Sequence, residues 1–484
     1  MQTSEQRVNM ALISAIVAVA TIGGLLFGYD SGAVNGTGAG LTEAFDLNSA
    51  QFGFTVGSLL IGCAVGAFFA GRLADVIGRK KVMIIAAVFF VIAALIQGIT
   101  GDHTIFVLAR FSAGMAVGAA SVLSPLYISE VAPANIRGRL TTMQQVMIIT
   151  GLTAAFVVNY LLAQAAGGST GELDGIPAWR WMYLAQMLPA GIFLVALFFI
   201  PESPRYLVAK GRVDEARHVL TRIFGSDTAE RKVGEIRASF DDAHRPRLSD
   251  VTQKGTILRP IVWAGLVIAT FQQFVGINII FYYGETLWTL AGSSEETALE
   301  RNILSGAVSI AAVLVALLVI DKVGRKPLLM IGSVGMAVTL GAMTWAFSGA
   351  GTDAAGNLAL SETAGFTALV AANLYVIFFN FSWGPVMWVM LGEMFPNQIR
   401  GSALAVAGLA QWTANYVVVQ SFPWMAENLG LAATYAFYTV SAVISFFLVK
   451  KFINETKGKE LEEMEGWEKP AAAGDGQVNT ARLD

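Results

Sequence analysis

Long apolar runs separated by short polar segments dominate the pattern of this chain. A helix needs about 18–25 mostly apolar residues to cross the hydrocarbon core of a bilayer, which is roughly 30 Å thick. About twelve runs reach that length, half of them before a polar stretch at 201–257 and half after it. The expected membrane helices cover residues 11–34, 51–71, 82–100, 104–128, 140–163, 179–200, 258–283, 302–320, 328–348, 365–391, 401–422 and 431–450.

An internal repeat indicates that the two sets of apolar runs are related. The segment 75–80, Asp-Val-Ile-Gly-Arg-Lys, returns as Asp-Lys-Val-Gly-Arg-Lys at 321–326. A glutamate followed by an Arg-Gly pair also occurs in both halves. These positions are Glu130 with Arg137 and Glu393 with Arg400. Membrane proteins built from two similar halves are most often transporters that move one half against the other.

We therefore predict an all-α integral membrane protein with about twelve transmembrane helices in two six-helix bundles. Apolar residues recur at helical spacing near Val213 and Val233, so we expect a small cytoplasmic helical insert between the bundles, with a flexible linker as the alternative. The predicted units are an N-terminal bundle (1–200), the helical linker (201–257), a C-terminal bundle (258–452) and a cytoplasmic tail (453–484).

The distribution of charge predicts the orientation of the helices. Only 14% of the 484 residues are charged and 55% are hydrophobic, which is too apolar for a water-soluble protein. Of the 32 lysines and arginines, all but Arg110, Arg180 and Arg301 lie in the even-numbered loops and in the terminal segments. Positively charged loops stay in the cytoplasm, so we expect both termini on that side. The loops on the other side are short, which indicates a location in the plasma membrane of a bacterium, that is, in its inner membrane.

A cleaved signal peptide is the competing interpretation of residues 1–30. The apolar run is too long for a signal peptide and contains Asp30, so we interpret it as the first membrane helix. The net charge of −3 gives no indication of a nucleic-acid partner. The expected partners are instead the lipid bilayer and the transported solutes.

The composition argues against a metal centre, a cofactor and an enzyme. Cys63 is the only cysteine, and the three histidines (His103, His218 and His244) are too scattered for a metal site. The sequence has no phosphate-binding loop of the G-x-x-x-x-G-K-[ST] kind, which weakens an ATP-driven pump. It also offers no catalytic constellation. Any concentrating transport would therefore draw on an ion gradient.

Two charged residues fall well inside predicted membrane helices of the first half, Asp30 and Arg110, while Arg180 lies at the very start of its helix. An ionised aspartate at mid-membrane costs about 2.5–3.5 kcal/mol, so it usually serves a function. An aspartate that merely meets water at the outer end of its helix is the alternative. Arg110 cannot lose its charge and needs a carboxylate. We expect Asp30 to pair with Arg110 when ionised and to leave it when protonated, which would couple proton binding to conformation.

The second half carries uncharged polar and aromatic residues instead. Amides offer donors and acceptors to sugar hydroxyls, and flat rings can cover the apolar face of a sugar. Singly, such amides often hold helices together and such tryptophans often mark the membrane interface. Together they predict a sugar site. The candidates are Gln272, Gln273, Asn278, Tyr282, Tyr283, Trp388, Gln411, Trp412 and Asn415.

Glycine and proline interrupt several apolar runs. Gly276 and Gly384–Pro385 predict bends in the second half, where a pocket must open and close. Four glycines in or just after the first run either permit bending or allow close helix packing. They are Gly28, Gly32, Gly36 and Gly38.

Taken together, the chain resembles the sugar porter family of the major facilitator superfamily, which includes bacterial proton–sugar symporters and glucose facilitators. The resemblance covers nearly the whole chain. Its motifs are Gly71–Asp75 with Lys80, Glu130 with Arg137–Arg139, Pro201–Arg205, Gln272–Asn278, Asp321–Lys326, Ser382–Pro385, and Gln411–Trp412 with Asn415.

The resemblance implies roles that the residues alone do not establish. It implies that Gln272, Gln273, Asn278, Trp388, Gln411 and Trp412 line the sugar pocket and that Phe27 and Tyr283 close around it. It also implies cytoplasmic salt-bridge networks that hold the outward-facing state. Their members would be Asp75, Arg79, Glu130, Arg137, Glu202, Arg205, Asp321, Arg325, Glu393 and Arg400.

Position 30 discriminates within the family, because proton-coupled members resemble this chain in having aspartate there and animal-like facilitators typically have asparagine. Three positions depart from the family pattern. Leu152 stands where many members have a pocket glutamine, Gln186 where some have an acidic residue, and Asn454 where proline is usual. Gln186 leaves Asp30 as the main proton site.

We thus expect a monomeric transporter that imports a monosaccharide, glucose first and xylose next, with a proton by alternating access. An uncoupled facilitator would keep the same pocket and make Asp30 incidental. A polyol such as inositol could use the same amides. A sugar sensor that does not transport is a further alternative, although the tail after residue 452 is short for a signalling module.

Overall fold

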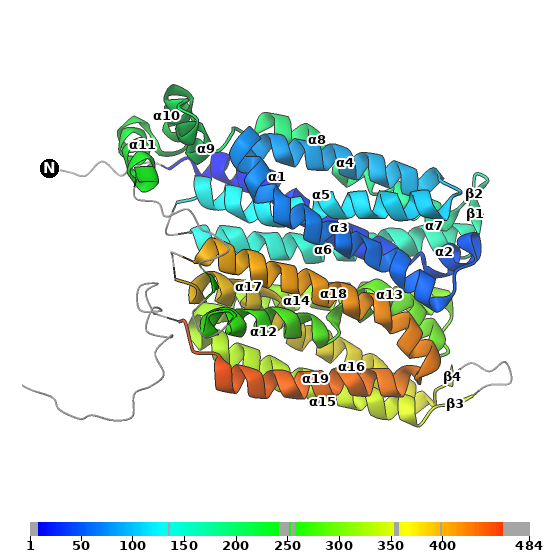
Figure 1. Ribbon diagram of the computed structural model, residues 1–484. Coiled ribbons are helices and arrows are strands. Elements are labelled where there is room, and N and C mark those ends of the chain that lie inside the picture. Colours follow the sequence, from blue (N-terminus) through cyan, green and yellow to red (C-terminus); the bar gives the residue numbers. More distant parts are fainter. Residues whose placement is uncertain are drawn as a thin grey trace, which may run out of the picture.

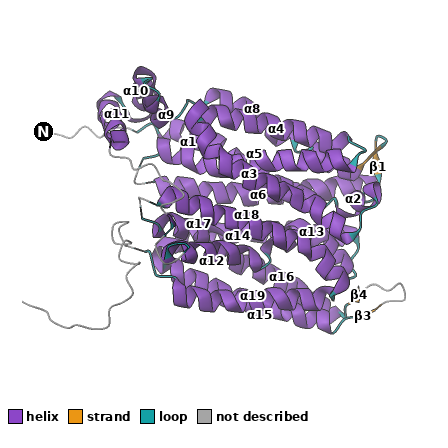
Figure 2. Cartoon of the chain, viewed as in Figure 1, coloured by secondary structure: helices purple, strands orange, loops and turns teal. Residues whose placement is uncertain are grey.

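The computed structural model is helical almost throughout (Figure 2) and describes residues 8–133, 136–241, 251–252, 257–352, 358–396 and 399–457. Within these residues, 12 helical segments are long and apolar enough to cross a membrane. Figure 1 shows two groups of helices, one from each half of the chain, packed side by side.

The first half holds eight of the described helices and one short hairpin, in which β1 pairs antiparallel with β2. Their bounds are α1 (Met10–Asn35), α2 (Gly38–Phe45), α3 (Ser49–Ile77), α4 (Arg79–Ile99), α5 (His103–Val131), α6 (Arg137–Ala166), β1 (Glu172–Leu173), β2 (Ile176–Pro177), α7 (Ala178–Leu184) and α8 (Met187–Phe199).

The second half repeats this plan with a second antiparallel hairpin, β3 with β4. Its elements are α12 (Pro260–Phe274), α13 (Ile277–Leu290), α14 (Glu295–Val323), α15 (Arg325–Ser348), β3 (Gly351–Thr352), β4 (Leu358–Ala359), α16 (Glu362–Phe381), α17 (Trp383–Met394), α18 (Arg400–Asn428) and α19 (Gly430–Phe452).

The predicted insert between the halves is helical and consists of α9 (Pro204–Ala209), α10 (Val213–Phe224) and α11 (Ser226–Asp241). One face of α10 is buried at helical spacing, including Ala216, Leu220 and Ile223. The backbone N–H of Asn9 donates to the carbonyl of Ile223 at 2.9 Å and so ties the start of α1 to the insert. Residues 242–250, 253–256 and 458–484 lie outside the described residues.

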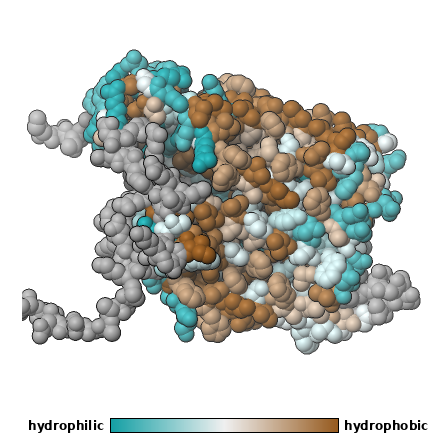
Figure 3. All heavy atoms as spheres, viewed as in Figure 1, coloured by the Kyte–Doolittle hydropathy of each residue, from teal (hydrophilic) through white to brown (hydrophobic). Residues whose placement is uncertain are grey.

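The two ends of the molecule differ (Figure 1). We call the end that carries α9–α11 the insert end, and the end that carries β1–β4 the hairpin end. Figure 3 shows apolar side chains over much of the surface between these ends and polar side chains at both. Large apolar side chains such as Leu188 and Phe199 are 71% and 81% exposed, which suits contact with lipid.

The helices run several residues beyond the apolar runs, because polar side chains cap their ends. The run at 302–320 predicts α14, yet this helix begins at Glu295, where the Ser294 side chain accepts a hydrogen bond from the backbone of Thr297. Asn48 and Gln51 form a reciprocal capping box at the start of α3. Polar caps therefore define ends that hydrophobicity does not.

The glycines of α1 serve close packing rather than bending. The helix is continuous from Met10 to Asn35. A Cβ atom on Gly28 would lie 1.7 Å from the carbonyl oxygen of Ile148, and one on Gly32 would lie 2.7 Å from that of Leu152. Thus α1 and α6 touch at backbone distance and Gly28 and Gly32 serve packing, whereas Gly36 and Gly38 lie at the break between α1 and α2.

Two helices of the second half are interrupted. Gly276 has a left-handed backbone (φ +87°) between α12 and α13, a conformation that favours glycine. The other break lies at Ser382 (φ −127°, ψ −89°), not at Gly384–Pro385 as predicted. Pro385 lies in the first turn of α17, where its missing N–H removes no helical hydrogen bond.

The contact at Gly28 leads to a stability prediction. Gly28→Ala should lower the midpoint of thermal unfolding in detergent by several degrees, because overpacking costs about 1–3 kcal/mol. Gly191→Ala is the matched control, since a Cβ there meets no atom within 4 Å. Equal unfolding midpoints for the two variants would contradict the backbone contact between α1 and α6.

Candidate functional site

The break at Gly276 brings the amides of α12 and α13 together. Because the chain turns there, Asn278 lies beside Gln273, and its Nδ2 donates to Gln273 Oε1 at 2.6 Å. The same Nδ2 donates to Asn415 Oδ1 of α18 at 2.7 Å. Three of the predicted sugar-site residues are therefore in direct contact, although they come from three helices.

Two more amides extend this cluster. Gln273 Nε2 donates to Gln272 Oε1 at 2.5 Å, and Gln411 Nε2 donates to the same oxygen at 3.4 Å. Gln411 Oε1 and Asn415 Nδ2 are buried and make no hydrogen bond with the described residues. We call Gln272, Gln273, Asn278, Gln411 and Asn415 the amide cluster. It offers one acceptor and one donor that a polar ligand could satisfy.

Aromatic rings from both halves adjoin the cluster. Phe27 of α1 meets Trp412 of α18 edge to face, with ring centroids 5.6 Å apart, so this pair joins the two halves. Tyr283 is fully buried and donates to the carbonyl of Val419 at 2.8 Å. Trp388 is 41% exposed and takes no part in these contacts. The structure thus brings the five predicted amides together and pairs Phe27 with Trp412, whereas Tyr283 bonds to Val419 and Tyr282 to Ser31.

Asp30 and Arg110 meet in the interior of the first half, as predicted. Arg110 Nη2 lies 3.4 Å from Asp30 Oδ2, and both side chains are fully buried. Charge-assisted hydrogen bonds are usually about 2.7–2.9 Å long, so this contact is loose. Asp30 Oδ1 and Arg110 Nε have no hydrogen-bond partner among the described residues. The alternative, in which Asp30 meets water at the outer end of its helix, is therefore wrong for this conformation.

The surroundings of this pair are polar but uncharged. Arg110 also donates to Gln97 Oε1 and to the carbonyl of Val56, each at 3.4 Å, and its guanidinium lies 6.0 Å from the ring centre of Tyr183. The amide of Gln186, at the break between α7 and α8, lies beside Asp30 without a well-formed hydrogen bond. Leu152 is buried against α1.

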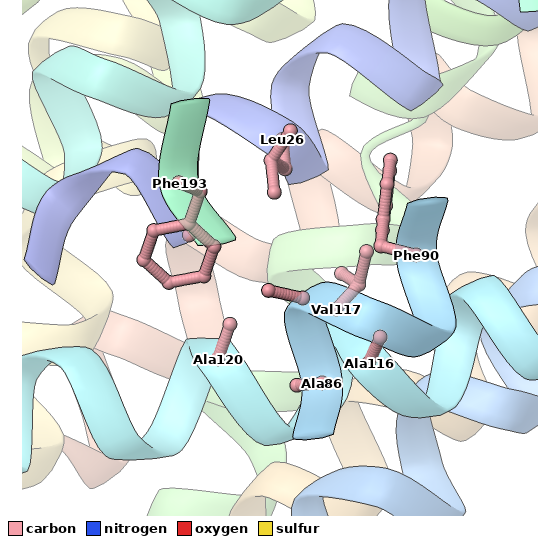
Figure 4. Close-up of a pocket in the computed structure, with 9 residues that line it drawn as sticks. Leu26, Ala86, Phe90, Ala116, Val117, Ala120 and Phe193 are labelled. Carbon is pink, nitrogen blue, oxygen red and sulfur yellow. The ribbon is translucent and has the colours of Figure 1, made fainter. Parts of the chain in front are cut away.

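A separate apolar pocket lies within the first half. Figure 4 shows Leu26, Phe90 and Phe193 around it, and small residues of α4 and α5 complete the lining. No polar side chain lines this pocket. It therefore offers no hydrogen bonds to a sugar and is not a candidate site.

At the insert end, the repeated motif of the first half forms a clasp around Arg79. Its guanidinium pairs with Glu130 at 3.1 Å and with Asp75 at 2.9 Å. Glu202 accepts hydrogen bonds from the backbone N–H groups of Arg79 and Lys80 at 3.0 and 3.2 Å. Glu202 thus caps the exposed N–H groups at the start of α4.

The second half repeats the clasp around Arg325. The guanidinium pairs with Glu393 at 2.8 Å and with Asp321 at 3.0 Å. Glu455 accepts from the backbone N–H groups of Arg325 and Lys326 at 2.9 and 3.0 Å, so it caps α15 as Glu202 caps α4. In this conformation, these contacts of the two clasps link residues within one half.

The other predicted gating residues are less informative. Arg400 donates to the carbonyl of Phe395 at 3.1 Å, and Arg205 also has an interaction partner. The side chain of Arg137 lies outside the described residues. Their gating roles stay predictions.

Glu455 was not among the predicted site residues, because its place after the last helix suggested a solvated tail. The signal was available, because Glu202-Ser203 and Glu455-Thr456 are a further repeated pair. Thr456 donates to Glu393 at 2.6 Å just as Ser203 donates to Glu130 at 2.5 Å.

Asn35, at the end of α1, is a second residue that was not predicted from the sequence. Asn35 Nδ2 donates to the carbonyls of Ile280 and Phe281 at 3.1 and 3.0 Å, and Asn35 Oδ1 accepts from the backbone N–H of Glu285 at 3.1 Å. The helix α13 is kinked at Tyr283, which frees these backbone groups. One amide of the first half thus replaces helical hydrogen bonds of the second half and joins the halves near the hairpin end.

The chain is similar to known transporters over nearly its whole length. A family model described as "Sugar (and other) transporter" matches residues 16–466. The chain belongs to this sugar transporter family. The predicted fold and the family resemblance are thereby confirmed, and the family consists of transporters, not enzymes.

Individual relatives agree with this assignment. The transporter is 45% identical over 463 residues to the glucose transport protein of Synechocystis sp., covering 95% of this chain and 98% of that protein. It is 37% identical over 496 residues to the D-xylose-proton symporter of Escherichia coli, with coverage of 95% and 96%. The inward open conformation of the E. coli xylose transporter XylE matches with a TM-score of 0.79 and 36% identity, covering 94% and 99%.

The cap on α15 leads to a pH prediction. Burial raises the pKa of Glu455, but hydrogen bonds from four backbone N–H groups outweigh it and hold that pKa below its ordinary value of 4.5. The stabilisation should therefore be complete above that value and be lost as pH falls through the lowered pKa. Glu455→Gln should cost about 0.5–1 kcal/mol at pH 7 and progressively less below about pH 4.5.

Thermal unfolding in detergent across pH measures this difference. Glu427→Gln, at an exposed position near the end of α18, is the control and should leave the unfolding midpoint nearly unchanged. A Glu455→Gln penalty that is the same at pH 3.5 and pH 7 would contradict the capping role.

Proposed function

We propose that this protein imports a monosaccharide together with a proton by alternating access across the plasma membrane of a bacterium. The observation that carries the proposal is the buried, loosely held contact between Asp30 and Arg110, 3.4 Å apart, next to helices that reach the amide cluster. The relatives, a glucose transport protein and a D-xylose-proton symporter, support both the sugar and the proton in this proposal.

The amide cluster would bind the sugar. A sugar hydroxyl is both donor and acceptor, so it can satisfy Gln411 Oε1 and Asn415 Nδ2, the two buried atoms without partners among the described residues. The edge-to-face pair of Phe27 and Trp412 would supply the apolar surface for the ring. In this proposal Trp388 contributes only in another conformation.

Asp30 would carry the proton. Ionised, it is held by Arg110, and once protonated it loses that attraction. Helix α1 transmits the change, because one turn before Asp30 it carries Phe27 against Trp412, and one residue later Ser31 donates to the hydroxyl of Tyr282 at 3.1 Å. Protonation would thus shift contacts of α1 with both α18 and α13.

Alternating access fits the contacts between the halves. At the hairpin end, a Cβ on Gly53 of α3 would lie 2.4 Å from the carbonyl of Gln420 of α18, and Gln420 Nε2 donates to the carbonyl of Ala50 at 3.0 Å. We place the insert end and both termini in the cytoplasm, because lysine and arginine gather there. The described conformation is then closed to the outside and would alternate with one closed at the clasps.

Glucose is our first choice of substrate and xylose the second. The identity is higher to the glucose transport protein (45%) than to the D-xylose-proton symporter (37%). Since both halves surround the site within one chain, we propose a working monomer. An uncoupled facilitator, an inositol symporter and a sugar sensor are the outcomes that the following measurements separate.

Asp30→Asn should abolish accumulation but keep exchange. With about 2.3 kcal/mol released per proton at 100 mV, the wild type could accumulate sugar roughly forty-fold per 100 mV. The variant should only equilibrate it, while counterflow of labelled sugar in proteoliposomes persists. Sugar-induced alkalinisation of the medium should vanish with it. Accumulation by Asp30→Asn would point to another proton site, and absence of alkalinisation in the wild type to a facilitator.

Gln411→Leu and Asn415→Leu should each raise the KM for glucose about 10- to 100-fold, because each loses a hydrogen bond worth about 1–3 kcal/mol. Asn428→Leu, at an exposed position near the end of α18, is the control. Competition by unlabelled xylose, galactose and inositol against labelled glucose identifies the substrate. Normal KM values in both site variants would argue against the amide cluster, and no counterflow in the wild type would favour a sensor.

A further inference from the structure

Glu285 is a buried carboxylate in α13 that the proposed proton pathway does not use. Glu285 is only 4% exposed to solvent. It lies five residues before the end of α13 at Leu290, about 7.5 Å along the helix axis. A carboxylate at this place is costly when ionised and usually indicates a function.

Its partners are hydroxyl groups. Thr289 Oγ1 donates to Glu285 Oε1 at 2.9 Å, and Thr286 Oγ1 lies 3.4 Å from Glu285 Oε2. No salt bridge to Glu285 occurs among the described residues. Two hydroxyls do not compensate a buried negative charge, so this conformation suits the protonated carboxyl.

The charged neighbours do not change this conclusion. Glu295 of α14 acts on Glu285 through its charge, and because it is itself acidic it does not stabilise a carboxylate there. Titratable groups on the surrounding helices include Tyr29 and Asp30 on α1, Glu43 on α2, Glu295, Glu296, Glu300 and Arg301 on α14, Glu362 and Tyr375 on α16, and Tyr416 and Glu427 on α18.

The carboxyl lies at the contact between the two halves. An added Cβ on Gly38, at the start of α2, would lie 3.4 Å from Glu285 Oε2 and 2.9 Å from the hydroxyl of Thr286. The backbone N–H of Glu285 donates to Asn35 Oδ1. Both Asn35 and Gly38 belong to the first half, so the burial of Glu285 depends on closure of the hairpin end.

We infer that Glu285 is a second proton-binding site, which takes up a proton when the hairpin end closes and releases it on the same side when that end opens. Opening would separate Glu285 from α1 and α2 and expose it to water, where the carboxylate is solvated. Protonation of Glu285 thus stabilises the closed hairpin end, and the proton is not carried across the membrane. The inference rests on the proposed alternating access, and it adds a pH-dependent gate to it.

Distances between two spin labels across the hairpin end, measured by double electron–electron resonance, test this inference without sugar or a proton gradient. Spin labels at Ala44 and Glu427, both exposed, report opening after Cys63→Ala removes the native cysteine. The background is Asp30→Asn, which eliminates the other titration. With Glu285 present, the ratio of open to closed populations should rise with pH by up to about tenfold per unit.

Glu285→Gln should hold the hairpin end closed at every pH, whereas Glu285→Asp should keep the pH dependence. Glu296→Gln, on the exposed first turn of α14, is the matched control and should behave as the parent. A pH response that survives Glu285→Gln, or no response in the parent although sugar opens the hairpin end, would overturn the inference. A hairpin end that opens under no condition would instead refute alternating access itself.

Discussion

The charge of Arg110 constrains the whole first half of the molecule. A guanidinium keeps its proton, and this one is fully buried, so the fold has to surround it with acceptors. They come from three helices: Asp30 from α1, Gln97 from α4 and the carbonyl of Val56 from α3. Because only Asp30 can change its charge, protonation is the one event that alters the balance without unfolding the site. In the proposed mechanism, the position of α1 is therefore linked to proton binding at Asp30.

Rigid halves make such a local change useful. At the insert end, Glu202 and Glu455 bind backbone N–H groups at the start of α4 and α15, while Arg79 and Arg325 pair within their own halves. Gly78 and Gly324 (φ +106° and +101°) let these carboxylates approach, since an added Cβ would lie 2.3 and 2.7 Å from them. Each half is held together by its own clasp, so a shift of α1 at the interface can move one half against the other.

The sequence predicted what depends on local pattern and missed what depends on distant partners. Apolar runs are sufficient to find membrane helices, and residues such as Gln272 and Asn415 were identifiable because polar groups in such runs are unusual. The sequence predicted a bend at Gly384–Pro385, but the helix breaks at Ser382. This prediction was wrong because proline fits the first turn of a helix as well as a bend. Asn35, Glu285 and Glu455 escaped because their importance comes from the backbone groups or the opposite half that they contact, which a linear pattern does not reveal.

In the proposed alternating access, the kink of α13 would make closure of the hairpin end reversible. At Tyr283 the helix leaves its regular path (φ −123°, ψ 19°), and the carbonyls of Ile280 and Phe281 accept hydrogen bonds from Asn35. Buried backbone groups in a membrane must find partners. If the halves part, those carbonyls can regain helical partners by straightening α13 or can meet the water that enters. In the proposed cycle, closing would replace those partners by Asn35 of α1, so the free-energy difference between the two states would be small enough for a bound proton to decide between them.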